Sequence, residues 1–191
     1  MRVIAGTFRS RTLQAPAGPA TRPTSDRLRE TLFNVVAPRI AGARFLDLYA
    51  GSGAVGIEAL SRGAGEVCFV ERAAPALKVL RANLERLGIA RGVRIVSGSV
   101  AGFLRGGGTE PGFDLVFLDP PYDAEREYAA VLHALGGVAA AVLSSEALVV
   151  AEHRRKDQLG DGYGALGRTR LLQQGDAALS FYANTKTAVS C

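Results

Sequence analysis

The stretch FLDLYAGSGAVG, residues 45–56, decides the fold class of this chain. Its apolar start is typical of a buried strand, its glycine-rich middle of a tight turn, and its last residues favour a helix. Gly51, Gly53 and Gly56 have the G-x-G-x-x-G spacing found where strand–turn–helix units bind nucleotides. The spacing alone fits NAD, FAD or S-adenosylmethionine.

Two carboxylates narrow that choice. Glu71 follows Gly51 by twenty residues, at the end of the next apolar run, where an acid would hold both hydroxyls of a ribose. Asp47 stands four residues before Gly51, close enough to the turn to receive the ammonium of an amino-acid moiety. Asp47 and the Asp119–Tyr122 motif together favour S-adenosylmethionine as the cofactor, because a hydride-transfer enzyme has no evident use for an Asp-Pro-Pro-Tyr sequence.

A second motif predicts the chemistry. Residues 113–118 (FDLVFL) are expected to form a buried strand of a parallel sheet, and Asp119, Pro120, Pro121 and Tyr122 follow it. The exocyclic amine of guanine or adenine is a poor nucleophile because its lone pair is delocalised into the ring. A carboxylate and a main-chain carbonyl that accept its two N–H bonds would free that lone pair, while the prolines stiffen the turn and the tyrosine stacks on the base. The alternative is an ordinary strand-ending turn.

These motifs, in this order, resemble those of the class I S-adenosylmethionine-dependent amino-methyltransferases. Residues 1–6 (MRVIAG) and 21–34 (TRPTSDRLRETLFN) are similar to the opening of the bacterial 16S ribosomal RNA guanine-N2-methyltransferases of the small-subunit type. The similarity extends from residue 1 to about 183. It implies methylation of the N2 amine of a specific guanine in 16S rRNA, within the small subunit or an assembly intermediate, by a cytoplasmic monomer that uses no metal. Guanine N2 is implied by the resemblance alone.

The positive charge lies at one end of the chain. The 191 residues have a formal net charge of +5, and residues 1–44 contain eight arginines but no lysine. Guanidinium forks match phosphate in a bidentate manner, which favours contact with an RNA backbone. An arginine-rich coding bias is the alternative, since the whole chain has only three lysines. From the charge and the family motif, the predicted RNA contacts are Arg2, Arg9, Arg11, Arg22, Thr24 and Arg27.

One departure from the class concerns the adenine site. Relatives carry an acid just after the third strand, and here Ser99 occupies that position. Its hydroxyl, or the backbone amide of Val100, is the expected adenine contact, with weaker binding as the consequence. The predicted cofactor residues are therefore Asp47, Gly51, Gly53, Gly56, Glu71 and Ser99.

The order of the segments predicts an α/β fold with a doubly wound mixed sheet. Strands alternate with helices along the chain, and an antiparallel hairpin around 173–176 closes it. The resemblance implies a Rossmann-like sheet of seven strands in the order 3-2-1-4-5-7-6. We divide the chain into a basic extension, residues 1–40, and a methyltransferase core, residues 41–191.

The extension itself is expected to contain two short strands and a helix. The strands cover residues 1–6 and 11–15 around a basic turn, and the helix begins at Thr24 or Ser25 and ends near Pro38.

Several classes of protein are disfavoured. The chain has no run of 18 apolar residues and no evident signal peptide, so neither a membrane span nor export is expected. Cys68 and Cys191 cannot build a disulfide framework, and Cys68 is expected to be a buried thiol. Without a His/Cys cluster no zinc site is expected. The remaining alternatives are an adenine-N6 methyltransferase acting on DNA or RNA, a non-catalytic RNA- or nucleotide-binding Rossmann module, and a dehydrogenase.

Overall fold

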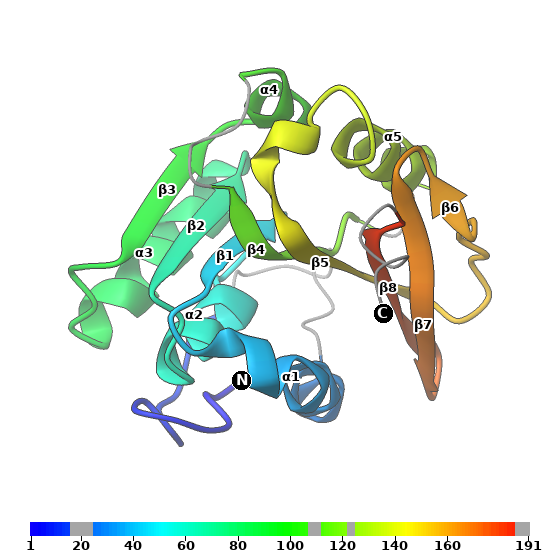
Figure 1. Ribbon diagram of the computed structural model, residues 1–191. Helices are drawn as coiled ribbons and strands as arrows, with labels where there is room; N and C mark the ends of the chain where they lie inside the picture. The colour runs from blue at the N-terminus through cyan, green and yellow to red at the C-terminus, as the bar shows by residue number, and fades with distance from the viewer. Residues whose placement is uncertain (16–24, 107–111, 122–124, 186–191) are drawn as a thin grey trace.

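The computed structural model describes residues 1–15, 25–106, 112–121 and 125–185, and it contains one mixed sheet (Figure 1). The eight strands lie in the order β3-β2-β1-β4-β5-β8-β7-β6. β1 to β5 run parallel to their neighbours, and β8, β7 and β6 complete the sheet antiparallel. The strands are β1 (Arg44–Leu48), β2 (Glu66–Glu71), β3 (Val93–Ser97), β4 (Phe113–Leu118), β5 (Leu143–Arg154), β6 (Gly162–Tyr163), β7 (Leu166–Gln174) and β8 (Ala177–Asn184).

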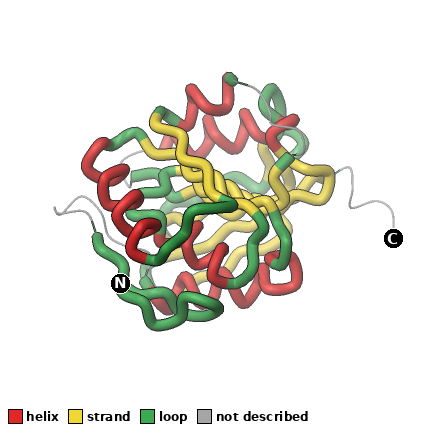
Figure 2. Tube along the Cα trace, turned by 90° about the vertical axis from the view of Figure 1, so that its left-hand side faces the viewer, coloured by secondary structure: helices red, strands yellow, loops and turns green. Residues whose placement is uncertain are grey.

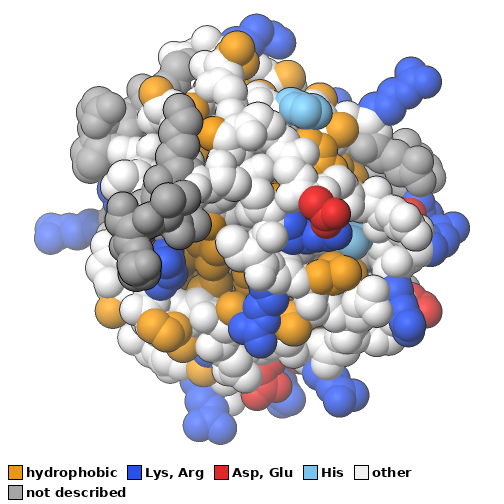
Figure 3. Space-filling view, turned by 45° about the vertical axis from the view of Figure 1, so that its right-hand side comes forward, with side chains coloured by type: hydrophobic (Ala, Val, Ile, Leu, Met, Phe, Trp, Pro, Cys, Tyr) orange, Lys and Arg blue, Asp and Glu red, His pale blue; other side chains and the backbone are white. Residues whose placement is uncertain are grey.

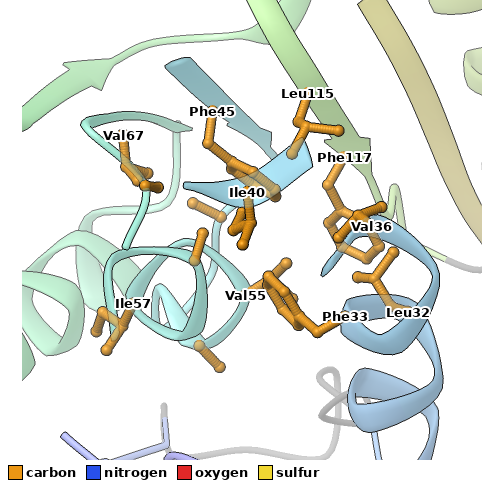
Figure 4. Close-up of a cluster of buried hydrophobic side chains, with 14 of the residues drawn as sticks. Leu32, Phe33, Val36, Ile40, Phe45, Val55, Ile57, Val67, Leu115 and Phe117 are labelled. Atoms are coloured by element: carbon orange, nitrogen blue, oxygen red, sulfur yellow. The ribbon is translucent and has the colours of Figure 1, made fainter. Parts of the chain in front are cut away.

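Helices cover both faces of the sheet, as Figures 1 and 2 show. One apolar cluster joins a face of the sheet to α1 (Asp26–Ile40), α2 (Ala54–Ser61) and α3 (Ala74–Arg86). The other face packs against α4 (Val100–Arg105) and α5 (Glu125–Leu135), and the short 3-10 helix η1 (Ala140–Val142) precedes β5. Figure 4 shows the first cluster, in which Phe33 and Val36 of α1 meet Phe45, Leu115 and Phe117 of the sheet.

The predicted α/β class and strand order are confirmed, with one addition. β8 and β7 occupy the places of the seventh and sixth strands of the expected order, but β6 adds an eighth strand at the edge. β6 has two residues, which pair with Gly167 and Leu166. A pair of residues is too short to show an alternating pattern, and for the same reason the six-residue α4 was not predicted.

The N-terminal segment differs from the expected pair of strands. The two arms do meet around the predicted turn, through one antiparallel bridge between Arg2 and Thr12 and three backbone hydrogen bonds, but they do not form regular strands. The segment is also held by α2, because the Glu58 carboxylate accepts hydrogen bonds from the backbone N–H groups of Ile4 and Ala5 at 2.7 and 3.0 Å. Val3 and Leu13 are buried in the same cluster as the sheet, so residues 1–40 share the core of the domain.

Helix α1 begins as expected and ends later. The Ser25 hydroxyl caps it by accepting the N–H of Leu28. The expected end near Pro38 was wrong, since the helix continues to Ile40. Pro38 removes one backbone hydrogen bond in the last turn, and burial of Ile40 against the sheet outweighs that loss. No helix in the described ranges is long and apolar enough to cross a membrane.

Candidate functional site

Four acidic residues lie along one edge of the sheet. Asp47 is in β1, Glu71 ends β2, Asp119 follows β4, and Glu152 lies two residues before the end of β5. Because these strands are parallel, their carboxyl ends meet at the same edge, where ligands of open α/β sheets bind. The sheet therefore brings the two sequence motifs together.

A cavity of about 340 Å³ opens at this edge, and we call it the cofactor cavity. Its volume lies in the range of small-molecule sites. Seven of the predicted site residues line it: Asp47, Gly51, Glu71, Ser99, Asp119, Pro120 and Pro121. Tyr122 lies outside the described residues. Gly53 and Gly56 are not among the residues that line the cavity.

The three glycines of the turn have different roles. Gly51 has a φ of +56°, and a Cβ there would meet nothing closer than the Tyr49 carbonyl at 4.0 Å, so its backbone faces open space. A Cβ on Gly53 would come within 2.2 Å of Leu80, and one on Gly56 within 2.3 Å of the Phe69 ring. The last two positions are therefore required for packing α2 against its neighbours.

Asp47 is buried beneath the glycine turn. One carboxylate oxygen accepts the N–H of Gly56 at 2.9 Å, in the first turn of α2. Burial raises the pKa of Asp47 to about 7; the Gly56 hydrogen bond lowers it and the Glu71 charge raises it. Ionising this buried carboxyl without a partner costs free energy. A cation that enters the cavity would stabilise the ionised form of Asp47 and would be attracted to it.

Glu71 closes the turn from the other side. One of its oxygens accepts the N–H of Gly51 at 2.8 Å, and the other accepts the N–H groups of Arg72 and Ala73 at 2.8 and 2.7 Å. These bonds fix the carboxylate at the cavity wall, and the oxygen that accepts only the Gly51 N–H can still accept a hydrogen bond from a ligand diol.

Asp119 is partly exposed, and Pro120 is buried beside it. Burial of the carboxyl raises the pKa of Asp119 well above its usual value, and the charges of Glu152 and Asp47 raise it further. Tyr49 also lines the cavity and has a φ of +64°, so backbone strain occurs at the site. Burial raises the pKa of its hydroxyl, and the nearby Glu127 carboxylate raises it further.

Ser99 lines the cavity at the start of α4. Its hydroxyl oxygen accepts the N–H of Gly102 at 3.1 Å and so caps the helix. The hydroxyl proton and one lone pair remain for a ligand.

The sequence did not reveal a second hollow. It has a volume of about 810 Å³ and lies between the start of α1, the end of β5 and the β7–β8 turn; we call it the α1–β8 groove. Its lining includes Ser25, Leu28, Glu152, Arg154, Arg155, Lys156 and Ala177. Figure 3, which brings the right-hand side of Figure 1 forward, shows Lys and Arg side chains spread over this face with hydrophobic side chains between them. The basic triplet at the end of the last parallel strand was the available signal.

The arginines of the N-terminal segment divide into two groups. Arg2, Arg9, Arg11 and Arg27 are exposed, while Arg22 and Thr24 lie outside the described residues. Three others, which were counted in the charge of this segment, have structural roles. Arg29 is fully buried beside Glu58, Arg39 donates to the Glu146 carbonyl, and Arg44 pairs with Glu66. The charge available to a partner is therefore smaller than the sequence count.

Comparison with known proteins identifies the family. The family model described as "Conserved hypothetical protein 95" matches residues 1–183. This chain belongs to that family. It is 38% identical over 183 residues to "Putative rRNA methyltransferase YlbH" of Bacillus subtilis, covering 95% of this chain and 98% of that protein.

A sequence relative and a solved structure, both from Escherichia coli, support the same assignment. "Ribosomal RNA small subunit methyltransferase D" is 44% identical over 122 residues, which cover 64% of this chain and 60% of that protein. The structure of "Putative methyltransferase yhhF" superposes with a TM-score of 0.84 at 34% identity, covering 96% of this chain and 97% of that one. The predicted class I methyltransferase fold is thereby confirmed for this member of the family.

Proposed function

We propose that this protein transfers the methyl group of S-adenosylmethionine to the exocyclic N2 amine of a guanine in 16S ribosomal RNA. One observation carries the proposal: Asp47, Glu71 and Asp119 line a single cavity, so the predicted cofactor contacts and the predicted amine contact share one site. The names of the relatives support ribosomal RNA of the small subunit as the substrate.

The cavity fits the cofactor by its chemistry. S-adenosylmethionine carries an ammonium group, a ribose diol and an adenine, and when bound it supplies an electrophilic methyl group on a positively charged sulfur. Asp47 offers a buried carboxylate for the ammonium, and Glu71 offers a fixed acceptor for the diol. The open face of Gly51 admits a ligand close to the backbone, and Ser99 remains for the adenine.

The chain's own groups activate the amine. The Asp119 carboxylate and the Pro120 carbonyl accept the two N2–H bonds of guanine, which localises the nitrogen lone pair toward the cofactor cavity. As the new N–C bond forms, the amine loses a proton, and Asp119, whose pKa is raised, is the acceptor within reach. Tyr122 is the proposed stacking partner of the flipped base. No residue of the protein forms a covalent bond with the substrate in this mechanism. The rate enhancement therefore comes from aligning the amine with the methyl group and from polarising the amine.

The α1–β8 groove is the proposed path for the RNA strand. Arg155 and Lys156 on its wall are exposed. Ser25 and Leu28 at the start of α1 also line it, and the exposed Arg27 lies between them in the chain, where it can meet phosphates. The N-terminal segment also reaches the site, since Met1 and Ala15 line the cofactor cavity. Cytoplasmic action as a monomer on the small subunit, or on an assembly intermediate, completes the proposal.

The decisive experiment is methyl transfer to RNA. Free 16S rRNA and small subunits from cells that lack the gene are incubated with the protein and labelled S-adenosylmethionine, and the digested RNA is examined by mass spectrometry. N2-methylguanosine at one position is the expected product. N6-methyladenosine would replace this proposal by the adenine-N6 alternative, and cofactor binding without transfer to either substrate would support the non-catalytic module.

Two variants separate the assigned roles. Asp119→Ala should lower kcat by at least about 100-fold with little change in cofactor affinity, since it removes amine polarisation. Glu71→Ala should weaken cofactor binding by about tenfold or more, since it removes the diol acceptor. Equal losses of both quantities in both variants would contradict the division.

The basic residues can be tested by salt. Arg27→Ala and Arg155→Ala should each reduce the dependence of RNA affinity on salt concentration by about one phosphate contact. Arg39→Ala is the matched control, because Arg39 is also an exposed arginine but bonds the Glu146 carbonyl. An unchanged slope in the first two variants would remove the groove from the RNA path.

A further inference from the structure

Glu152 is a buried carboxylate that the mechanism above does not use. The last paired residues of β4 and β5 are Leu118 and Ala151, so Asp119, which directly follows β4, and Glu152 of β5 each come one residue after that pair. Neighbouring positions in a parallel pair project to the same face, with strands about 4.8 Å apart. Glu152 is only 3% exposed, and it lines the α1–β8 groove.

The strand register therefore brings the two carboxylates to the adjacent carboxyl ends of β4 and β5. Asp119 lines the cofactor cavity and Glu152 lines the groove. The charge of Glu152 raises the pKa of Asp119, which shows that the two groups are close enough to repel each other. A ligand with two adjacent N–H donors would be complementary to these two carboxylates, because hydrogen bonds to ionised acceptors are strong.

Guanine has such an edge and adenine does not. Guanine presents its N2 amine directly beside an N1–H donor, whereas the atom beside the amine of adenine is N1, a bare acceptor. A carboxylate facing N1 would accept a hydrogen bond from guanine and would oppose the lone pair of adenine. Sites built to bond a substrate N–H strongly reject analogues that lack it.

We propose that Glu152 accepts the N1–H of the target guanine while Asp119 accepts an N2–H, so that Glu152 determines which purine is methylated. This inference rests on the proposed function, and it adds the residue that selects the base. Glu152 touches the part of the base that does not react. Its removal therefore changes the preference between bases, whereas loss of Asp119 lowers turnover on every base.

The test compares two bases at the target position identified by the methyl-transfer assay. One RNA carries guanine there, and the other carries 2-aminopurine, which keeps the 2-amine but has an acceptor at N1. The wild-type protein should prefer guanine by at least about 100-fold in kcat/KM. Glu152→Gln should lower that preference at least about tenfold, because its amide oxygen is a weaker acceptor for N1–H and its amide nitrogen can donate to the N1 of 2-aminopurine.

A matched control removes one negative charge from the same groove. Asp176 also lines the groove but is exposed on the β7–β8 turn, so Asp176→Asn should leave the preference unchanged. A second variant, Glu152→Asp, keeps the charge and moves it back by one methylene. It should lower kcat/KM while retaining the preference for guanine.

The outcomes distinguish the inference from the proposed function. If Glu152→Gln lowers both rates equally, Glu152 has only a structural role and the inference is overturned, while guanine methylation by the wild type stands. If the wild type methylates both bases equally well, the inference is overturned without reference to any variant. If the wild type methylates no guanine at all, the proposed function fails first.

Discussion

Replacing Asp47 by Asn should stabilise the fold at neutral pH while weakening cofactor binding. Asp47 is buried, and its pKa is raised from 3.8 to about 7. The amide oxygen of Asn can still accept the Gly56 N–H, so the substitution removes a buried charge and preserves the contact to α2. Stability and function then change in opposite directions.

The pH dependence fixes the size of the effect. A carboxyl with a higher pKa in the folded state keeps its proton on folding, so its contribution to stability is lost as pH rises from 3.8 to about 7. A shift of about three pKa units corresponds to about 4 kcal/mol at pH above 7, which is an upper limit for the gain in Asp47→Asn. Below pH 4 both side chains are neutral and the two proteins should be about equally stable.

Urea denaturation of both proteins between pH 4 and 8 measures this difference. The variant should gain stability relative to the wild type up to about pH 7 and no further. Cofactor affinity of the wild type should rise up to about tenfold per pH unit below pH 7, because an ammonium requires the ionised carboxylate, and the variant should lose this dependence. A stability difference that stays constant over the whole range would refute the account of Asp47.

Three further predictions concern the fold. Glu58→Gln should lower the free energy of unfolding by about 3–5 kcal/mol, measured in urea, because it breaks a buried charge pair and loosens the N-terminal segment; a loss below about 1 kcal/mol would contradict this role. Gly53→Ala should cost about 1–3 kcal/mol more than Gly88→Ala, since both have positive φ but only the first Cβ clashes; equal melting temperatures would contradict the packing role. In a Cys191→Ser background, Cys68 should react with a thiol reagent at pH 8 only after unfolding, because burial raises its pKa to about 11; rapid labelling of the native protein would exclude a buried thiol.

Much of the fold could be predicted because its signals are local. The apolar run at 45–48 with its glycine turn, and the run at 113–118, gave the strands β1 and β4. The structure differs where tertiary packing outweighs a local rule. Helix α1 passes Pro38, and β5 runs from Leu143 to Arg154, well beyond the apolar run ALVVA at residues 147–151. In β5, pairing with β4 and β8 along its length extends the strand into polar sequence.

The candidate site was predictable in part, for a related reason. Asp47, Glu71 and Asp119 are recognisable because each has a fixed distance from a strand end or a glycine turn. Glu152 is not part of a recognisable motif in the sequence. It is a candidate site residue only because β5 pairs with β4. The arginines show the opposite: Arg29 belongs to the basic segment that predicts RNA contact, but it is buried against Glu58 and is not available to RNA.

The sequence by itself determined the class of fold, the cofactor chemistry and the amine-binding motif, since these depend on residue types at short and regular spacings. Only the tertiary structure decided which charged side chains face a ligand and which are paired within the protein. It also decided that an acid more than thirty residues beyond Asp119 stands next to it. The physical reason is that charge and hydrogen bonding act through space, and pairing of distant strands sets those distances.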